Sequence, residues 1–459
     1  SDARYTFAPT DAKVGSISTF VMQNLTFISD AKNQDIKQSE EAMELKMVKM
    51  PSLQMAMPIP EVANIKNYTT DLANNVFHLI KTIQSFIKIK HVKILPLIRE
   101  LIHALRQAPK KLILQVHKEC EDTFKEQPEL FQLFHDILPT VATKEAVDVM
   151  IEQAILAPFR SMDEDTMVAR RIRSLASMNN VIHKQTILNL MRSCEKIITK
   201  RDRKETMKAL LLTIGSLTRT YLDQRQPNLN YISDSDKSMG SRVLGFFDRM
   251  MRRNIATIDS KEEKVIVFCK AIGNTGIQQA SQIMLNYIFD RKNVANSIRV
   301  QAVWSMSTIA TRHEEFSRNA LLPMFFDISE DAELRVAAYM VVMKTKPPRV
   351  VLDSIVEAVR RERVKQVKSF VLTHMLNIVN TPCECEQLLK NNVSAILETV
   401  SLPADMGLQY SHVLRMPLVG EQNNLGIQSG MIWTPEDFLP RSGNVRLFFE
   451  TSGKSVNIF

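Results

Sequence analysis

The strongest constraint on the fold is a helical periodicity that recurs through the middle of the chain. In residues 77–87, and again in residues 94–105, apolar side chains fall at positions i, i+3, i+4 and i+7. This spacing gathers them on one face of an amphipathic helix. Only 12 of the 459 residues are glycine, well below the usual share of roughly 7%. A glycine-rich all-β sandwich or barrel is therefore disfavoured, and a mainly helical chain is predicted.

Some of these helical segments repeat. Arg299-Val300-Gln301-Ala302 and Arg335-Val336-Ala337-Ala338 each open an apolar helix, 36 positions apart. Gln366-Val367-Lys368-Ser369 opens another helix 31 positions further on. Periods of about 30–40 residues with two helices each are typical of an α-solenoid. Breaks between the helices are predicted at Leu138-Pro139 and Leu322-Pro323, and residues 211–216 and 269–274 are interpreted as helices that end in glycine.

Both ends of the chain change to a period of two. Residues 17–27 and 44–50 alternate polar and apolar positions, which is typical of strands with one buried face. Four of the twelve glycines lie in residues 406–432, and residues 445–459 predict a hairpin around Gly453. The predicted chain is α+β but mainly α, with a β region over 1–60, a helical superhelix over 61–402 and a second β region over 403–459.

No motif for catalysis or for metal binding is found. The nine histidines lack ligand spacing, and no nucleophile elbow, phosphate-binding loop or dinucleotide-binding loop occurs. His78, His103 and His117 are given structural or solvent-facing roles. The pair Cys383-x-Cys385 lacks a second pair that would complete four metal ligands, which favours a structural thiol or a disulfide. We therefore predict no enzyme, no catalytic residue, no metal and no cofactor.

The basic excess lies entirely in the middle of the chain. Residues 60–400 hold 49 of the 59 basic and 38 of the 50 acidic residues, a net charge of +11. Four interpretations of the basic runs are open: solvated helix faces, anionic lipid headgroups, nucleic acid, and pairing with acidic residues on a neighbouring helix layer. Because aromatic platforms are scarce there, no nucleic-acid partner is expected. The runs are 170–173, 200–204, 249–253 and 360–363.

Two further features bear on the class of protein. No uninterrupted apolar run approaches the roughly 20 residues of a membrane-spanning helix, so an integral membrane protein is not predicted. Sequons for N-glycosylation begin at Asn24, Asn67 and Asn392, which is compatible with a secreted protein.

Short segments in the second half of the chain keep a recognisable order. They include Ala271-Ile272-Gly273-Asn274-Thr275-Gly276, the stretch from Leu321-Leu322-Pro323 to Asp327, Glu333-Leu334-Arg335-Val336-Ala337-Ala338-Tyr339 and Leu439-Pro440-Arg441-Ser442. In this order they resemble the motifs of the large lipid transfer protein superfamily. That superfamily contains vitellogenins, apolipophorins, apolipoprotein B and the microsomal triglyceride transfer protein, and the vitellogenin branch is preferred.

The resemblance implies an architecture and a function. Residues 1–60 would be the C-terminal part of an N-terminal β-barrel, 61–402 a horseshoe of paired helices, and 403–459 the start of an antiparallel lipid-cavity sheet. The chain would be a piece of a longer, secreted lipid transport and nutrient-reservoir protein that holds phospholipid and acylglycerol. Its other partners would be the remaining domains of the parent protein, a second copy and a lipoprotein-receptor family member. The candidate lipid-facing residues are Leu447, Phe449, Val456 and Ile458.

Other functions are open at this stage. An apolipophorin or apolipoprotein B-type circulating lipoprotein is one alternative, and a microsomal triglyceride transfer subunit in the endoplasmic reticulum lumen is another. A protein-binding α-solenoid scaffold belongs to a different class, because it would use the helices alone and leave both β regions unexplained.

Overall fold

A computed structural model of the chain gives two compact units, one within Pro51–Ala280 and the other within Ser281–Phe459. The mainly helical fold predicted from the sequence is confirmed. The predicted N-terminal strands lie outside the described residues, and the two boundaries between the three predicted domains stay predictions. The structure describes residues 70–88, 94–120, 127–155, 162–176, 182–225, 234–253, 258, 260–380, 387–398, 410–419, 423–433, 440–451 and 454–457.

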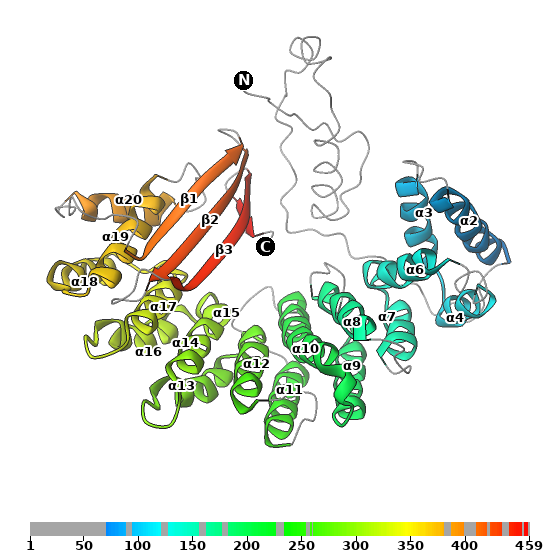
Figure 1. Cartoon of the computed structure of the whole chain (residues 1–459), viewed down its shortest axis with the longest axis horizontal. Coiled ribbons are helices and arrows are strands. Elements are labelled where there is room, and N and C mark those ends of the chain that lie inside the picture. The colour runs from blue at the N-terminus through cyan, green and yellow to red at the C-terminus, as the bar shows by residue number, and fades with distance from the viewer. Residues whose placement is uncertain are drawn as a thin grey trace, which may run out of the picture. The chain divides into compact units, whose positions relative to one another are not determined.

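The first unit is built of helices stacked in two layers (Figure 1). One layer runs through α3, α6, α8, α10 and α12, each packed on the next, and α4, α7 and α9 form a second layer. Such alternation is the packing of an α-solenoid. The elements are α2 (Thr70–Lys88), α3 (Ile94–Arg106), α4 (Lys110–Glu119), α6 (Pro128–Val141), α7 (Lys144–Met150), a π-helical turn (Ile151–Ile155), α8 (Met162–Leu175), α9 (Lys184–Ile197), a 3₁₀ turn (Arg201–Arg203), α10 (Lys204–Arg225), α11 (Asp234–Arg252), α12 (Lys261–Asn274) and a 3₁₀ turn (Gln278–Ala280).

The second unit continues with helices and ends in a sheet (Figure 1). Within it, α14 packs on α17, and α17 packs on α19. The helices are α13 (Ser281–Phe289), α14 (Asn296–Ser305), α15 (Ser307–Ala310), α16 (Glu314–Phe326), α17 (Ala332–Met343), α18 (Arg349–Arg361), α19 (Lys365–Val379) and α20 (Gln387–Leu397). The strands β1 (His412–Val419), β2 (Asn423–Trp433), β3 (Pro440–Thr451) and β4 (Lys454–Asn457) form one antiparallel sheet in the order β1-β2-β3-β4, with β1 against α19.

The apolar pattern of a helix matches the layer in which it lies. Every residue of α17 from Glu333 to Met343 is buried, so this helix is covered on all sides. By contrast, α18 buries only the stripe Leu352, Ile355, Val356 and Val359, the spacing of a helix with one solvated face. Helices that are apolar all round are the ones that pack between two neighbours, as α17 does between α14 and α19.

Three predicted helix ends are wrong. Pro139 and Pro323 lie inside α6 and α16, each in the last turn, where a missing backbone donor interrupts little of the remaining helix. Gly215 lies in the middle of α10, where a Cβ atom would come 2.1 Å from the carbonyl oxygen of Ala271 in α12. This glycine therefore permits close packing of two helices instead of ending one. In the part of the chain that the structure describes, no helix is both long and apolar enough to cross a membrane.

Candidate functional site

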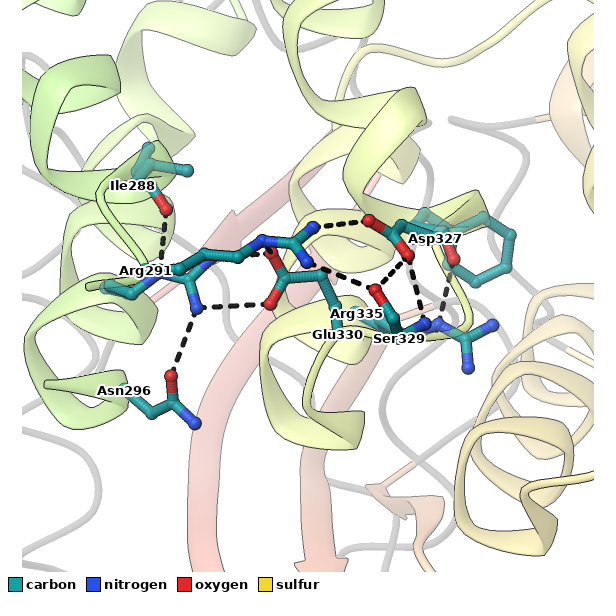
Figure 2. A network of polar contacts seen from close by, with 9 residues as sticks. Ile288, Arg291, Asn296, Asp327, Ser329, Glu330 and Arg335 are labelled. Carbon is teal, nitrogen blue, oxygen red and sulfur yellow. Dashed lines mark hydrogen bonds and ion pairs between the residues drawn. The ribbon is translucent and has the colours of Figure 1, made fainter. Parts of the chain in front are cut away.

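Two arginines from the repeated sequence motif lie buried at equivalent points of the second unit. Arg299 is the fourth residue of α14 and Arg335 the fourth residue of α17, and each is only 2% exposed. A buried guanidinium is stable only when its donors find partners. All three nitrogens of Arg299 have partners, whereas in Arg335 the Nε and one terminal nitrogen do and Nη1 does not. Figure 2 shows Glu330 and the loop that precedes α17.

Arg299 joins the end of one helix to the loop before another. Its Nε donates to the carbonyl oxygen of Ile288 in the last turn of α13, at 2.8 Å. This carbonyl is one of the last of the helix, which have no hydrogen-bond partner within the helix. The two terminal nitrogens of Arg299 donate to both carboxylate oxygens of Glu330, at 2.6 and 3.1 Å. Both side chains of this bidentate pair are 3% exposed.

Arg335 makes the same two kinds of contact one repeat later. Its Nε donates to the carbonyl oxygen of Phe325 at the end of α16, at 2.9 Å. A terminal nitrogen pairs with Glu362, which lies just before α19. Each joint thus consists of an arginine, a helix-end carbonyl and a glutamate that precedes the next helix of the same layer. Sequence reasoning missed these glutamates, although Glu330 and Glu362 precede Arg335 and Gln366 by five and four positions.

A second arginine extends the first joint toward solvent. The Nε of Arg291 lies 2.6 Å from Glu330, and another nitrogen donates to Ser329 at 3.1 Å (Figure 2). Arg291 also pairs with Asp327. Hydrogen bonds from Ser329 and then from Arg291 lower the pKa of the Asp327 carboxyl to about 2. The loop between α16 and α17 is therefore held by charge-assisted bonds.

The third copy of the motif has glutamine in place of arginine, and its contact differs in kind. The Oε1 of Gln366 accepts hydrogen bonds from the backbone N–H and the hydroxyl of Ser411, at 2.5 and 2.6 Å. Ser411 is the residue directly before β1. The motif that joins one helix pair to the next in α14 and α17 therefore joins α19 to the sheet.

Two of the basic runs place an arginine between helices. Arg171 is buried and its Nε donates to Asp136 at 2.7 Å, from α8 to α6. Arg203 is buried and donates to the carbonyl oxygen of Ile155. In the later runs, Arg252 pairs with Asp248 and Arg361 with Glu357 on exposed helix faces. Arg171 thus pairs with an acidic residue of the adjacent helix in its own layer, whereas Arg252 and Arg361 lie on exposed helix faces.

An acidic residue also links two helices. Three consecutive acidic residues, 163–165, lie in the first turn of α8. The carboxylate of Asp165 accepts from the backbone N–H groups of Glu205 and Thr206, at 2.7 and 2.9 Å. These belong to the first turn of α10, whose N–H groups have no partner within the helix. Asp165 therefore caps the neighbouring helix.

The register of the sheet shows which strand positions share a face, and it gathers several large apolar residues on one of the two faces. Residues directly opposite in antiparallel strands share a face, and successive residues alternate. Phe449 pairs with Leu425 and with Val456, and Leu447 pairs with Ile427. These positions and Leu414 fall on one face, together with Met416, Met431 and Val445. The same face also holds Ser429 between Leu414 and Val445, and His412, Asn423, Gly443, Thr451 and Lys454 toward its ends.

The other face has fewer large apolar residues and contains two glycines of β2, although Ile432 also lies on it. It contains Val413, Arg415, Gly426, Gln428, Gly430, Asn444, Arg446, Phe448 and Glu450. Val413 is buried next to α19, whereas Leu414 is 45% exposed. The apolar face is therefore the one turned away from α19 at β1.

Not all predicted site residues can be located. Leu447, Phe449 and Val456 share the apolar face by register, and Ile458 lies outside the described residues. Of the predicted glycosylation sites, Asn24 and Asn67 also lie outside them, and Asn392 is half-buried in α20. Whether these residues meet lipid or carry glycans stays a prediction.

The described cysteines and His135 are core groups. Cys120, Cys194 and Cys269 are buried and free, and Cys383 and Cys385 lie outside the described residues. Burial raises the pKa of the Cys269 thiol to about 12. His135 is 1% exposed, and neither ring nitrogen has a hydrogen-bond partner. Among the residues that the structure describes, no cluster of three metal-ligating side chains occurs.

A protein-family model for the vitellogenin TPR domain matches residues 70–376, which is more than half of the chain. The chain belongs to the vitellogenin TPR domain family. The predicted resemblance is thereby confirmed. Family membership also agrees with the predictions that the protein is not an enzyme and belongs among lipid-transport proteins of the vitellogenin and lipoprotein type.

Relatives of this vitellogenin-family chain are distant and much longer. It is 23% identical to vitellogenin-6 of Oscheius tipulae over 61% of this chain and 17% of that protein. It is 24% identical to apolipophorins of Locusta migratoria over 79% of this chain and 10% of that protein. The chain therefore spans less than a fifth of either relative.

The fold has a solved counterpart. A lipovitellin structure, solved to describe lipid–protein interactions in that protein, matches with a TM-score of 0.68. The match covers 86% of this vitellogenin-family chain and 40% of the lipovitellin chain, at 17% identity. At this identity the likeness concerns the fold.

Proposed function

We propose that this chain is the helical module and first sheet segment of a secreted lipid carrier. The sheet would contribute to a cavity for phospholipid and acylglycerol, and the helices would brace it. The observation that carries the proposal is the division of the sheet into an apolar face, with Leu447, Phe449 and Val456, and a second face, with Gly426 and Gly430. Ile458 is proposed as a fourth lipid-facing residue.

At β1, the face with more large apolar residues is the one turned away from α19. Helices normally cover the apolar face of a sheet, because burying apolar area stabilises by about 25 cal/mol per Å². Here α19 contacts β1 at Val413, and the adjoining Leu414 on the opposite face is exposed. Lipid chains are the occupants proposed for that apolar face, since they need no fixed shape and no hydrogen-bond partners.

The helical joints suit a bracing role. Arg299 with Glu330 and Arg335 with Glu362 connect successive helix pairs, and Gln366 with Ser411 connects the last of them to the sheet. Such bonds are directional and fix the orientation of the elements that they join. The proposed result is a helical frame that holds the sheet while lipid content changes.

The parent protein is proposed to be extracellular and of the vitellogenin type. The proposed partners are the remaining domains of the parent protein, a second copy and a member of the lipoprotein-receptor family. Asn24, Asn67 and Asn392 are proposed glycosylation sites. A circulating apolipophorin-like lipoprotein is the second candidate, because a relative of that name aligns over 79% of the chain. A transfer subunit in the endoplasmic reticulum lumen would have the same lipid chemistry.

Lipid extraction and mass spectrometry of the full-length native protein test the proposal. We expect phospholipid and acylglycerol in stoichiometric or higher amounts. A preparation without bound lipid would contradict lipid carriage and favour the alternative of a protein-binding solenoid scaffold.

Photo-crosslinking localises the lipid. Full-length protein loaded with a phospholipid that carries a photoreactive acyl chain should crosslink at Leu447 and Phe449. Phe448 is the matched control, because it has the same side chain as Phe449 and lies on the other face by register. Equal crosslinking at Phe448 and Phe449 would contradict the assignment of the apolar face.

A further inference from the structure

Strand β1 forms an outer edge of the sheet, with backbone hydrogen-bonding groups that face away from β2. Among the described strands, β1 is first in the order β1-β2-β3-β4 and pairs with β2 alone. An edge strand presents backbone N–H and C=O groups that can pair with another chain, and proteins cover or interrupt such edges. At the start of β1, side chains of a helix bond to these N–H and C=O groups.

Side chains of α19 occupy them at the start of the strand. The hydroxyl oxygen of Thr373 accepts from the backbone N–H of Val413 at 3.1 Å. The Nδ2 of Asn377 donates to the carbonyl oxygen of Val413 at 2.6 Å. Two residues before Val413, the backbone N–H of Ser411 donates to Oε1 of Gln366 at 2.5 Å. The three side chains stand at positions i, i+7 and i+11 of α19, which places them on one face of the helix.

Further along the same edge, the backbone itself disfavours pairing at Pro417. Because hydrogen-bonding groups alternate along a strand, Val413, Arg415 and Pro417 direct theirs to the same side. Proline has no N–H and cannot donate to a further strand. The register with β2 also shifts between Pro417 and Val419, and a bulge of this kind disturbs pairing at an edge.

We propose that α19 acts as a side-chain substitute for a neighbouring strand. Gln366, Thr373 and Asn377 take the bonds that such a strand would make with residues 411–413. They are positioning residues that hold β1 on the helical unit, and together with Pro417 they close this edge to another strand or another copy of the protein. The inference concerns the edge alone and does not depend on whether the apolar face carries lipid.

Hydrogen exchange in the full-length protein tests the proposal. Thr373→Val keeps the shape of the side chain but removes the acceptor for the Val413 N–H, whereas Thr373→Ser retains it. We expect Thr373→Val to speed exchange of the Val413 amide about tenfold, the effect of losing one hydrogen bond to a protected group. Thr373→Ser should exchange like the wild type, and amides of α17 should not change in either variant.

Thr82 provides the matched control for Thr373. Thr82 in α2 donates to the carbonyl oxygen of His78 at 2.8 Å, as Thr373 donates to that of Ser369 at 2.8 Å, so Thr82→Val repeats the chemical change in the other compact unit. Thr82→Val should leave the Val413 amide unaffected. The proposal is overturned when Val413 exchanges at the wild-type rate in Thr373→Val, when Thr373→Ser exchanges as fast as Thr373→Val, or when the wild-type amide is already unprotected.

Self-association gives a second measurement. The double variant Thr373→Val/Asn377→Leu frees both backbone groups of Val413, and an uncovered edge strand promotes pairing between copies. Sedimentation velocity of the full-length double variant should show concentration-dependent association beyond the wild-type state. If that variant does not fold, the single isosteric variant and its exchange rate decide the question. A folded double variant that sediments as the wild type contradicts closure of the edge.

Discussion

One terminal nitrogen of Arg299 lies 2.6 Å from Oε1 of Glu330, and both side chains are buried between α14 and the loop before α17. The pair is bidentate, and the remaining Nε of Arg299 bonds the end of α13. A buried ion pair stabilises little by comparison with apolar packing, but loss of one partner leaves an uncompensated charge. Removing one partner of this joint should therefore lower the stability of the second unit.

Arg299→Met should destabilise the second unit by about 3 kcal/mol, the lower end of the range for breaking a buried pair, because Arg291 still contacts Glu330. Denaturant unfolding followed by circular dichroism measures the change. The matched control is Arg361→Met, since Arg361 is 81% exposed and pairs with Glu357 in the same helix. That change should cost less than about 0.5 kcal/mol. Equal losses for the two variants would contradict a special role of the joint.

Gly215→Ala should destabilise the first unit by about 1–3 kcal/mol or more, because the added Cβ would come 2.1 Å from the carbonyl oxygen of Ala271 and the two helices must separate. Gly245→Ala in α11 is the control. Its nearest neighbour is the end of the Arg249 side chain at 3.8 Å, so alanine should stabilise by about 0.5–1 kcal/mol. Thermal unfolding of both variants should give shifts of opposite sign, and two shifts of the same sign would count against this packing.

His135 should make the first unit acid-sensitive. Burial, then the charge of Arg171 and then His117, lower its pKa from 6.5 to about 3. The unfolded chain therefore binds a proton that the folded chain does not, at pH values between the two. Stability from this group is complete above pH 6.5 and falls as the pH drops toward 3, by up to about 1.4 kcal/mol per pH unit.

His135→Phe should flatten this dependence, and the measurement is urea unfolding at pH 4, 5, 6 and 7. Phenylalanine suits the site, because the ring centres of Phe131 and Phe134 lie 4.4 and 5.7 Å from that of His135. His103→Phe, at an exposed position of α3, is the control and should keep the wild-type slope. An unchanged slope in His135→Phe would show that other groups cause the acid sensitivity.

Cys194 and Cys269 should resist thiol reagents in the folded protein. Burial raises the pKa of both thiols, to about 12 for Cys269, and only the thiolate reacts. Incubation with a maleimide at pH 8, followed by peptide mass spectrometry, should leave both unmodified until urea is added. Rapid labelling of either residue without urea would contradict its burial.

Much of the helical architecture was predictable from local pattern. The 3.6-residue periodicity of 77–87 and 94–105 predicts α2 and α3, and the repeated Arg-Val motif marks the starts of α14 and α17. Periodicity works for such elements because each helix buries a face whose residues are near neighbours in sequence. It failed at Pro139, Pro323 and Gly215, where residues that usually end helices are accommodated by their place in the last turn or by a close neighbour.

By itself, the sequence determined the mainly helical class, the order of the helices and the family resemblance carried by its motifs. Only the tertiary structure decided that Arg299 meets Glu330 and Arg335 meets Glu362, 31 and 27 positions away. It also decided that Gln366 bonds Ser411, 45 positions away, and which face of the sheet is turned from α19. The physical reason is that local periodicity fixes which side of a helix is buried, whereas the partner of a buried polar group depends on how distant elements stack.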